Sequence, residues 1–135
     1  LMGISFKNPR RVFRSVDRAM PGIVAVTDGP RGAVVSDGKR IYHAGIFKEK
    51  RVADRTGAGD AFGSGFVAGL MQREMRNEKG EMRYGKESVC YAMRLASANA
   101  TSVVERVGAT EGILTKAEFV RAKRFAHLSI SVYGL

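Results

Sequence analysis

The chain contains little cysteine and no long apolar stretch, and both absences narrow its class. Cys90 is the single cysteine among 135 residues, which excludes an internal disulfide framework and suits a reducing compartment. No apolar run approaches the roughly 20 residues that span a bilayer, so membrane insertion is not expected. No charged-then-apolar leader is present, although Leu1 is not an initiator and the natural start can lie upstream. We therefore expect a cytoplasmic protein.

Acidic residues are also scarce relative to basic ones. The sequence has 13 Asp and Glu against 23 Lys and Arg, a net charge of +10. Such a surplus is compatible with nucleic acid, an anionic membrane or a phosphorylated substrate. The basic residues are mostly scattered, however, so we interpret them as a solvated basic surface and expect neither nucleic acid nor a membrane as partner. The length and the 44% hydrophobic content suit one domain over residues 1–135.

Neither common nucleotide-binding loop occurs in the chain. There is no Gly-x-x-x-x-Gly-Lys-Ser/Thr, and Gly57-x-Gly59-x-x-x-Gly63 misses the dinucleotide spacing by one residue. The chain instead has Gly57-Ala58-Gly59-Asp60 where an apolar helical pattern begins. Small residues there leave backbone N–H groups open to an anion at the positive end of a helix. The carboxylate of Asp60 beside them predicts transfer of a phosphoryl group to an alcohol, with a simple capped helix end as the alternative.

A second candidate site is the turn Thr27-Asp28-Gly29-Pro30-Arg31-Gly32. It follows the β-branched run 23–27, whose continuous apolarity predicts a strand buried on both faces. Loops at the carboxyl ends of strands in an open α/β sheet commonly bind ligands. An ordinary turn is the alternative interpretation.

The rest of the pattern predicts an alternation of strands and helices, hence an α/β fold. Asp37-Gly38 between two apolar runs predicts a hairpin. The three glycines at 63, 65 and 69 each cost a helix about 1 kcal/mol relative to Ala, which predicts a close approach by another backbone or a ligand. The helices are expected at 9–20, 58–76, 86–107 and 116–125, the last opened by a capping box at 115–118, with an extended segment at 45–52 and a loop at 77–85.

These motifs together resemble those of the ribokinase-like (PfkB) carbohydrate kinases. Asp54-Arg55-Thr56-Gly57-Ala58-Gly59-Asp60 is similar to that family's C-terminal motif, and Thr27-Asp28-Gly29-x-x-Gly32-Ala33 is similar to its nucleotide-binding turn. Residues 104–109 resemble the segment that closes the nucleotide and cation sites. The resemblance runs from about 22 to 112 and implies a ribokinase-like three-layer α/β/α fold, of which this chain is the C-terminal portion only.

The resemblance also implies roles for individual residues. Asp60 corresponds to the general base, which contacts the acceptor hydroxyl, and the N–H groups of Gly57, Ala58 and Gly59 correspond to the anion hole for the transferring phosphoryl group. The implied ATP-binding positions are Thr27, Asp28, Gly29, Gly32, Gly59, Ser97 and Asn99. Ser97 stands where the family often has Asn or His, and Asn99 lies roughly 200° round the helix from it.

A cation site and a partner substrate follow from the same resemblance. Asp54 and the Thr56 carbonyl correspond to a potassium-type site, which the main chain around Val103, Arg106 and Gly108 would complete. The implied reaction is ATP-dependent phosphorylation of a hydroxymethyl group on a sugar or nucleoside, with ATP, Mg²⁺ and K⁺ as cofactors. A nucleotide-binding regulator without catalysis is the alternative, and so is a basic nucleic-acid-binding module.

One part of the family's pattern is missing from this sequence. The family's Asn-x-x-Glu motif and its sugar pocket belong upstream of Thr27, and neither is in this sequence. We therefore expect a fragment that is inactive alone. Its exposed sheet edge would be covered by a missing N-terminal part or by a second copy in a homodimer.

Overall fold

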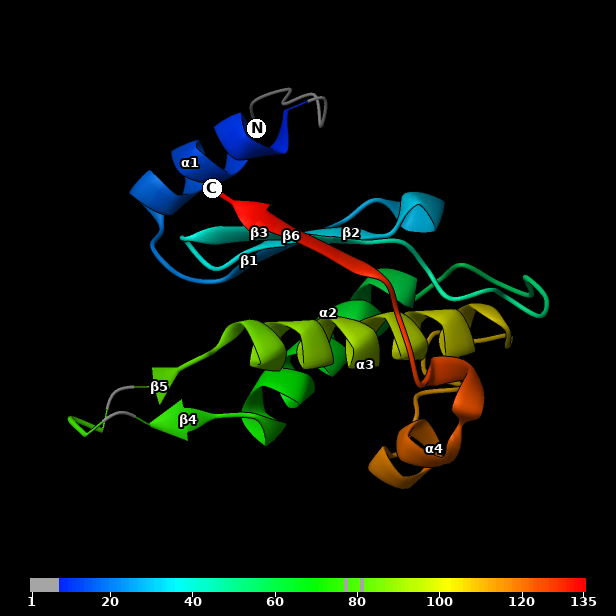
Figure 1. The fold of residues 1–135 in the computed structure, drawn as a ribbon. Helices are drawn as coiled ribbons and strands as arrows, with labels where there is room; N and C mark the ends of the chain where they lie inside the picture. Colours follow the sequence, from blue (N-terminus) through cyan, green and yellow to red (C-terminus); the bar gives the residue numbers. More distant parts are fainter. Residues whose placement is uncertain (1–7, 77, 81) are drawn as a thin grey trace. The chain divides into compact units, whose positions relative to one another are not determined.

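The computed structural model describes residues 8–76, 78–80 and 82–135, which form two compact units (Figure 1). One unit consists of residues 8–45 with 130–135, and the other of residues 46–129. Within the described ranges, none of the helices combines the length and apolarity needed to cross a membrane.

The first unit is an antiparallel sheet with one helix packed on it. The sheet has the order β1-β2-β3-β6, and all three pairings are antiparallel. The elements are α1 (Pro9–Ala19), β1 (Val24–Thr27), the 3-10 turn η1 (Gly29–Arg31), β2 (Ala33–Ser36), β3 (Arg40–Ala44) and β6 (Ile130–Gly134). Phe13 of α1 packs with Val34 and Ile41 to form the core of this unit, so the helix buries the face that carries Phe13.

The hairpin predicted at Asp37-Gly38 is confirmed. Asp37 Oδ1 accepts hydrogen bonds from the N–H groups of Lys39 (2.9 Å) and Arg40 (2.6 Å), and Oδ2 accepts one from the Tyr42 hydroxyl at 2.6 Å. Burial opposes ionisation of Asp37, but these hydrogen bonds outweigh it and lower the pKa of the carboxyl. The turn therefore holds an ionised carboxylate, which fixes the register of β2 against β3.

Two expectations for the strands are wrong. The run 23–27 is not buried on both faces, because β1 alternates half-buried and exposed residues along its length. β1 is an edge strand with β2 as its one neighbour among the described residues, and their pairing is antiparallel, whereas runs buried on both faces are typical of parallel sheets. Strand β6 was not expected at all, although the apolar Ile130 and Val132 alternate with Ser131, which is a strand signal.

The second unit is built on two long helices that lie side by side (Figure 1). Its elements are α2 (Ala58–Gln72), β4 (Met75–Arg76), β5 (Met82–Arg83), α3 (Lys86–Val104), α4 (Lys116–Arg121) and the 3-10 turn η2 (Lys123–Phe125). Leu95 and Ala98 of α3 pack with Phe119 and Phe125 to form its core, together with Phe47.

The helix boundaries differ from those expected. α2 ends at Gln72 rather than 76, because residues 75–76 pair with 82–83 in a short hairpin inside the expected loop. Asn77 and Glu81 of that loop lie outside the described residues. α3 ends at Val104, and residues 45–52 form no strand. The capping box is confirmed, since the Thr115 hydroxyl accepts from the Glu118 N–H and Glu118 accepts from the Thr115 N–H.

The glycines of α2 form a seam against α3. A Cβ at Gly69 would lie 2.6 Å from the Ala92 Cα, and one at Gly65 would lie 3.0 Å from the Ala96 Cα. The expected close approach is thus confirmed at these two positions. At Gly63, which is exposed, a Cβ would meet no protein atom, so no backbone approaches there among the described residues. The two backbones approach this closely because neither Gly65 nor Gly69 carries a side chain.

Two substitutions in α2 should have opposite effects on stability. Gly69→Ala inserts a methyl group into the seam and should lower the free energy of unfolding by about 1–3 kcal/mol. Gly63→Ala, the matched control, should raise it by about 0.4–1 kcal/mol because the residue is helical and open. Urea denaturation of the two variants measures both values, and a stable Gly69→Ala would mean that the seam is loosely packed.

Candidate functional site

The loop before α2 is shaped by Gly57, the residue that caps this helix. Gly57 has φ 81°, in the left-handed region, and a Cβ there would lie 2.6 Å from the Ala109 carbonyl oxygen. Both the backbone angle and the space demand glycine. The segment after α3 therefore packs directly against the turn that opens α2.

The N-terminus of α2 presents open donors beside a carboxylate. The Ala58 N–H donates to the Arg55 carbonyl over a long 3.3 Å. Among the described residues, no acceptor takes a hydrogen bond from the N–H of Gly59 or Asp60. The side chain of Asp60 is exposed in the first helical turn. Open N–H groups at the positive end of a helix bind oxyanions, and an accessible carboxylate beside them can accept a proton.

Asp54 turns back onto the same loop. Its Oδ1 accepts a hydrogen bond from the Thr56 N–H at 2.9 Å. This bond, with further ones from the Thr56 hydroxyl and the Gly108 N–H, lowers the pKa of Asp54 and keeps the carboxylate ionised. A single ionised carboxylate with neighbouring carbonyls fits a monovalent, oxygen-seeking cation. In the part of the chain that the structure describes, no three His, Cys, Asp or Glu cluster to hold a metal ion.

The segment that leads into the loop is clamped to the end of α3. The Val104 carbonyl accepts from the N–H groups of Ala53 (2.9 Å) and Asp54 (3.2 Å). The Glu105 carboxylate accepts from the Lys50 N–H at 2.7 Å and from the Arg124 guanidinium at 2.9 Å. Arg124 lowers the pKa of Glu105. No local pattern predicts this pair, because residues 19 positions apart in an irregular segment follow no periodicity.

The Thr27 turn belongs to the first unit and is tight. Gly32 has φ 96°, and a Cβ there would lie 2.0 Å from the Ala44 carbonyl oxygen, so only glycine fits. The Asp28 carboxylate is held at 2.7 Å by both Nε and Nη2 of Arg31, which lowers its pKa. Asp28 thus stabilises the turn, while the side chain of Thr27 is exposed.

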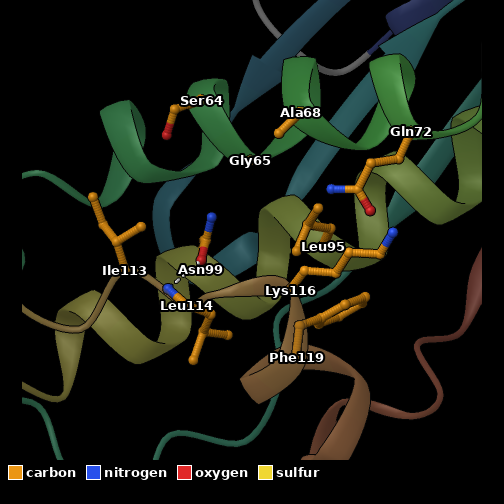
Figure 2. A pocket seen from close by; sticks show the side chains of 10 residues that line it. All are labelled: Ser64, Gly65, Ala68, Gln72, Leu95, Asn99, Ile113, Leu114, Lys116 and Phe119. Carbon is orange, nitrogen blue, oxygen red and sulfur yellow. Dashed lines mark hydrogen bonds between the residues drawn. The ribbon is translucent and has the colours of Figure 1, made fainter.

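Ser97 and Asn99 are both buried in α3 and are not brought together. The Asn99 Oδ1 accepts from the Leu114 N–H at 2.9 Å, and Asn99 lines a pocket from which Ser97 is absent (Figure 2). The pocket has a volume of about 200 Å³ and lies between α2, α3, residues 113–114 and α4. The two residues therefore do not face one ligand at this pocket.

Comparison with known proteins gives the family. Residues 12–116 match the pfkB family of carbohydrate kinases, and the chain belongs to that family. It is 32% identical over 87 residues to the fructosamine kinase FrlD of Bacillus subtilis, covering 64% of this chain and 26% of the relative. It is also 32% identical over 93 residues to the acarbose 7(IV)-phosphotransferase of an Actinoplanes species, covering 67% of this chain and 30% of the relative.

Solved structures show the ribokinase-like fold. The Vibrio cholerae fructokinase double mutant, with fructose, ADP and potassium bound, has a TM-score of 0.64 at 20% identity, covering 82% of this chain and 33% of that one. Ligand-free Burkholderia thailandensis nucleoside kinase has a TM-score of 0.55 at 27% identity, covering 76% and 29%. The partial α/β/α assignment is thus confirmed. The chain spans about a quarter to a third of the length of these relatives.

The Glu105–Arg124 pair should make stability depend on pH. Glu105 has a lowered pKa in the folded state, so the pair stabilises the fold above the unfolded value of about 4.3 and is lost as the pH falls through the folded value. Arg124→Met should cost on the order of 1 kcal/mol at pH 7, since the pair is partly exposed. Denaturation at pH 7 and pH 3 should show that cost shrinking in acid. Arg121→Met, an exposed neighbour, should cost little at either pH.

Proposed function

We propose that the protein transfers a phosphoryl group from ATP to a hydroxymethyl group of a sugar or nucleoside. The observation that carries this proposal is the pairing of open N–H groups with the exposed Asp60 in the first turn of α2. Family membership supports it, as do relatives named as fructosamine kinase and acarbose phosphotransferase. The chain spans about a third or less of the length of these relatives, and the proposal covers both classes of acceptor.

In this mechanism Asp60 accepts the proton of the acceptor hydroxyl as its oxygen attacks the γ-phosphorus. The bond to the leaving ADP oxygen breaks in the same displacement. The N–H groups of Gly57, Ala58 and Gly59 stabilise charge on the transferring group, and the α2 dipole adds to this. The Ala58 N–H would give up its long hydrogen bond to the Arg55 carbonyl and donate to a phosphoryl oxygen instead. Thr27, Gly29 and Gly32 would lie against the nucleotide, with Asp28 supporting their turn and Ser97 facing the base.

A metal contribution fits the same site. Asp54, the Thr56 carbonyl and the main chain at Val103, Arg106 and Gly108 are hard oxygen donors that would hold K⁺ beside the loop. A bound cation there would neutralise charge and stiffen the loop that carries the N–H groups. Mg²⁺ would accompany ATP, held chiefly by its phosphates.

Replacement of Asp60 tests the catalytic role. Asp60→Asn in the full-length protein should lower kcat by about 10²–10⁴ while ATP affinity stays nearly unchanged, because the amide cannot accept the proton. Glu87→Gln is the matched control, an exposed acid in the first turn of α3, and should keep full turnover. Near-normal turnover of Asp60→Asn across a panel of sugars and nucleosides would remove Asp60 from the role.

Assays on the wild-type protein distinguish the proposed kinase from the alternative, a nucleotide-binding regulator without catalysis. A regulatory nucleotide-binding protein would bind ATP analogues in calorimetry but phosphorylate none of the sugars or nucleosides. The proposal requires turnover with at least one of them.

The cation contribution has its own test. Asp54→Asn keeps an oxygen that can accept from the Thr56 N–H but removes the charge. It should raise the K⁺ concentration needed for half-maximal activity by about tenfold, the effect of 1.4 kcal/mol. Activity measured against K⁺, with tetramethylammonium maintaining ionic strength, checks this. An unchanged K⁺ dependence would place the cation elsewhere.

A further inference from the structure

The pocket between α2, α3 and α4 has side-chain donors that the proposed phosphotransfer does not use. Asn99 is 5% exposed, and its Oδ1 is occupied by the Leu114 N–H. Gln72 Oε1 is occupied by the Tyr91 hydroxyl at 2.9 Å. The oxygen of each amide is thereby fixed, and the nitrogen is left as a donor. Figure 2 shows the Asn99 nitrogen directed toward α2 and the Gln72 nitrogen directed back over Leu95.

These donors have no protein partner. Across residues 8–76, 78–80 and 82–135, no acceptor takes a hydrogen bond from Asn99 Nδ2, Gln72 Nε2 or the Lys116 ammonium. No Asp or Glu lines the pocket, and Lys116 gives its wall a positive charge. Solvent reaches these donors, since no buried side-chain nitrogen or oxygen among the described residues lacks a partner, and bonds from such donors to a charged acceptor are the strong ones. The pocket therefore favours an anion.

The apolar part of the pocket lining and the pocket volume restrict the size and shape of that anion. Leu95, Leu114 and Phe119 supply apolar surface, and the volume is about 200 Å³. Pockets for drug-sized ligands are larger, about 300–1,000 Å³. A compact body with one charged end fits both the volume and a lining that mixes apolar side chains with donors.

We propose that this pocket binds a small organic monoanion, a carboxylate on an apolar or aromatic body the size of benzoate, at a site separate from the nucleotide. The carboxylate oxygens accept from Asn99 Nδ2, Gln72 Nε2 and Lys116, while the body packs on Phe119 and the leucines. Ser97, the residue proposed to face the base, is not part of the lining.

Calorimetric titration of the full-length protein with sodium benzoate tests the proposal, with benzamide as the neutral isostere. Benzoate should bind at least about tenfold more tightly than benzamide, as expected for a charge-assisted contact. Gln72→Glu keeps the acceptor for Tyr91 but replaces the donor with a negative charge, and it should weaken benzoate binding about tenfold or more. Lys116→Met should weaken it by a similar factor. Both residues are exposed, so the variants should fold normally.

The controls separate this site from the proposed ATP site. Lys123→Met removes an exposed lysine that does not line the pocket and should leave benzoate affinity unchanged. A non-hydrolysable ATP analogue should not displace benzoate. Failure of benzoate to bind, equal affinity for benzamide, or competition by the analogue would each overturn the proposal. Loss of turnover in Asp60→Asn bears on the phosphotransfer alone and leaves the benzoate titration as an independent measurement.

Discussion

The contact of Gly57 with Ala109 is the constraint on which the candidate site depends. It joins the turn that opens α2 to the segment that follows α3, and it exists because Gly57 combines a left-handed backbone with the absence of a Cβ. Hydrogen bonds from residues 50–54 to Val104 and Glu105 hold the same two segments together from the other side. Open N–H groups can bind an anion effectively only when their backbone is fixed before the ligand arrives. Here packing and hydrogen bonds supply that rigidity while leaving the N–H groups of Gly59 and Asp60 open among the described residues.

The glycines at the contact between α2 and α3 also help to hold the candidate site rigid. Gly65 and Gly69 bring α2 close to α3, so the start of α2 and the end of α3 are held by rigid elements rather than by loops alone. The same close approach sets the position of Asn99, whose amide lies against Gly65. One short set of small residues therefore shapes both the N-terminal end of α2, where the candidate site lies, and the wall of the pocket farther along the helix.

Local patterns predicted the parts of this structure that local physics determines. The Asp37-Gly38 hairpin, the capping box at Thr115 and the helix opening at Gly57-Ala58-Gly59 depend on residues within a few positions of one another. The edge position of β1, by contrast, depends on which strands lie beside it, and apolarity alone cannot report that. The Glu105–Arg124 pair and the pocket around Asn99 bring together residues from separate elements. Ser97 and Asn99, two positions apart in sequence, lie roughly 200° apart around the axis of α3 and so face different directions.

The pairing of β3 with β6 has a consequence for how the protein is made. Ala44 pairs with Ile130, so the sheet of the first unit gains its last strand only after the whole second unit has left the ribosome. Until then β3 presents an open edge on a nascent chain, which is a template for unwanted strand pairing. The second unit is continuous in the chain, so it can fold while β3 still lacks its partner β6. Shortening the chain by its last six residues would leave that edge permanently open, and aggregation rather than lost chemistry would then be the first symptom.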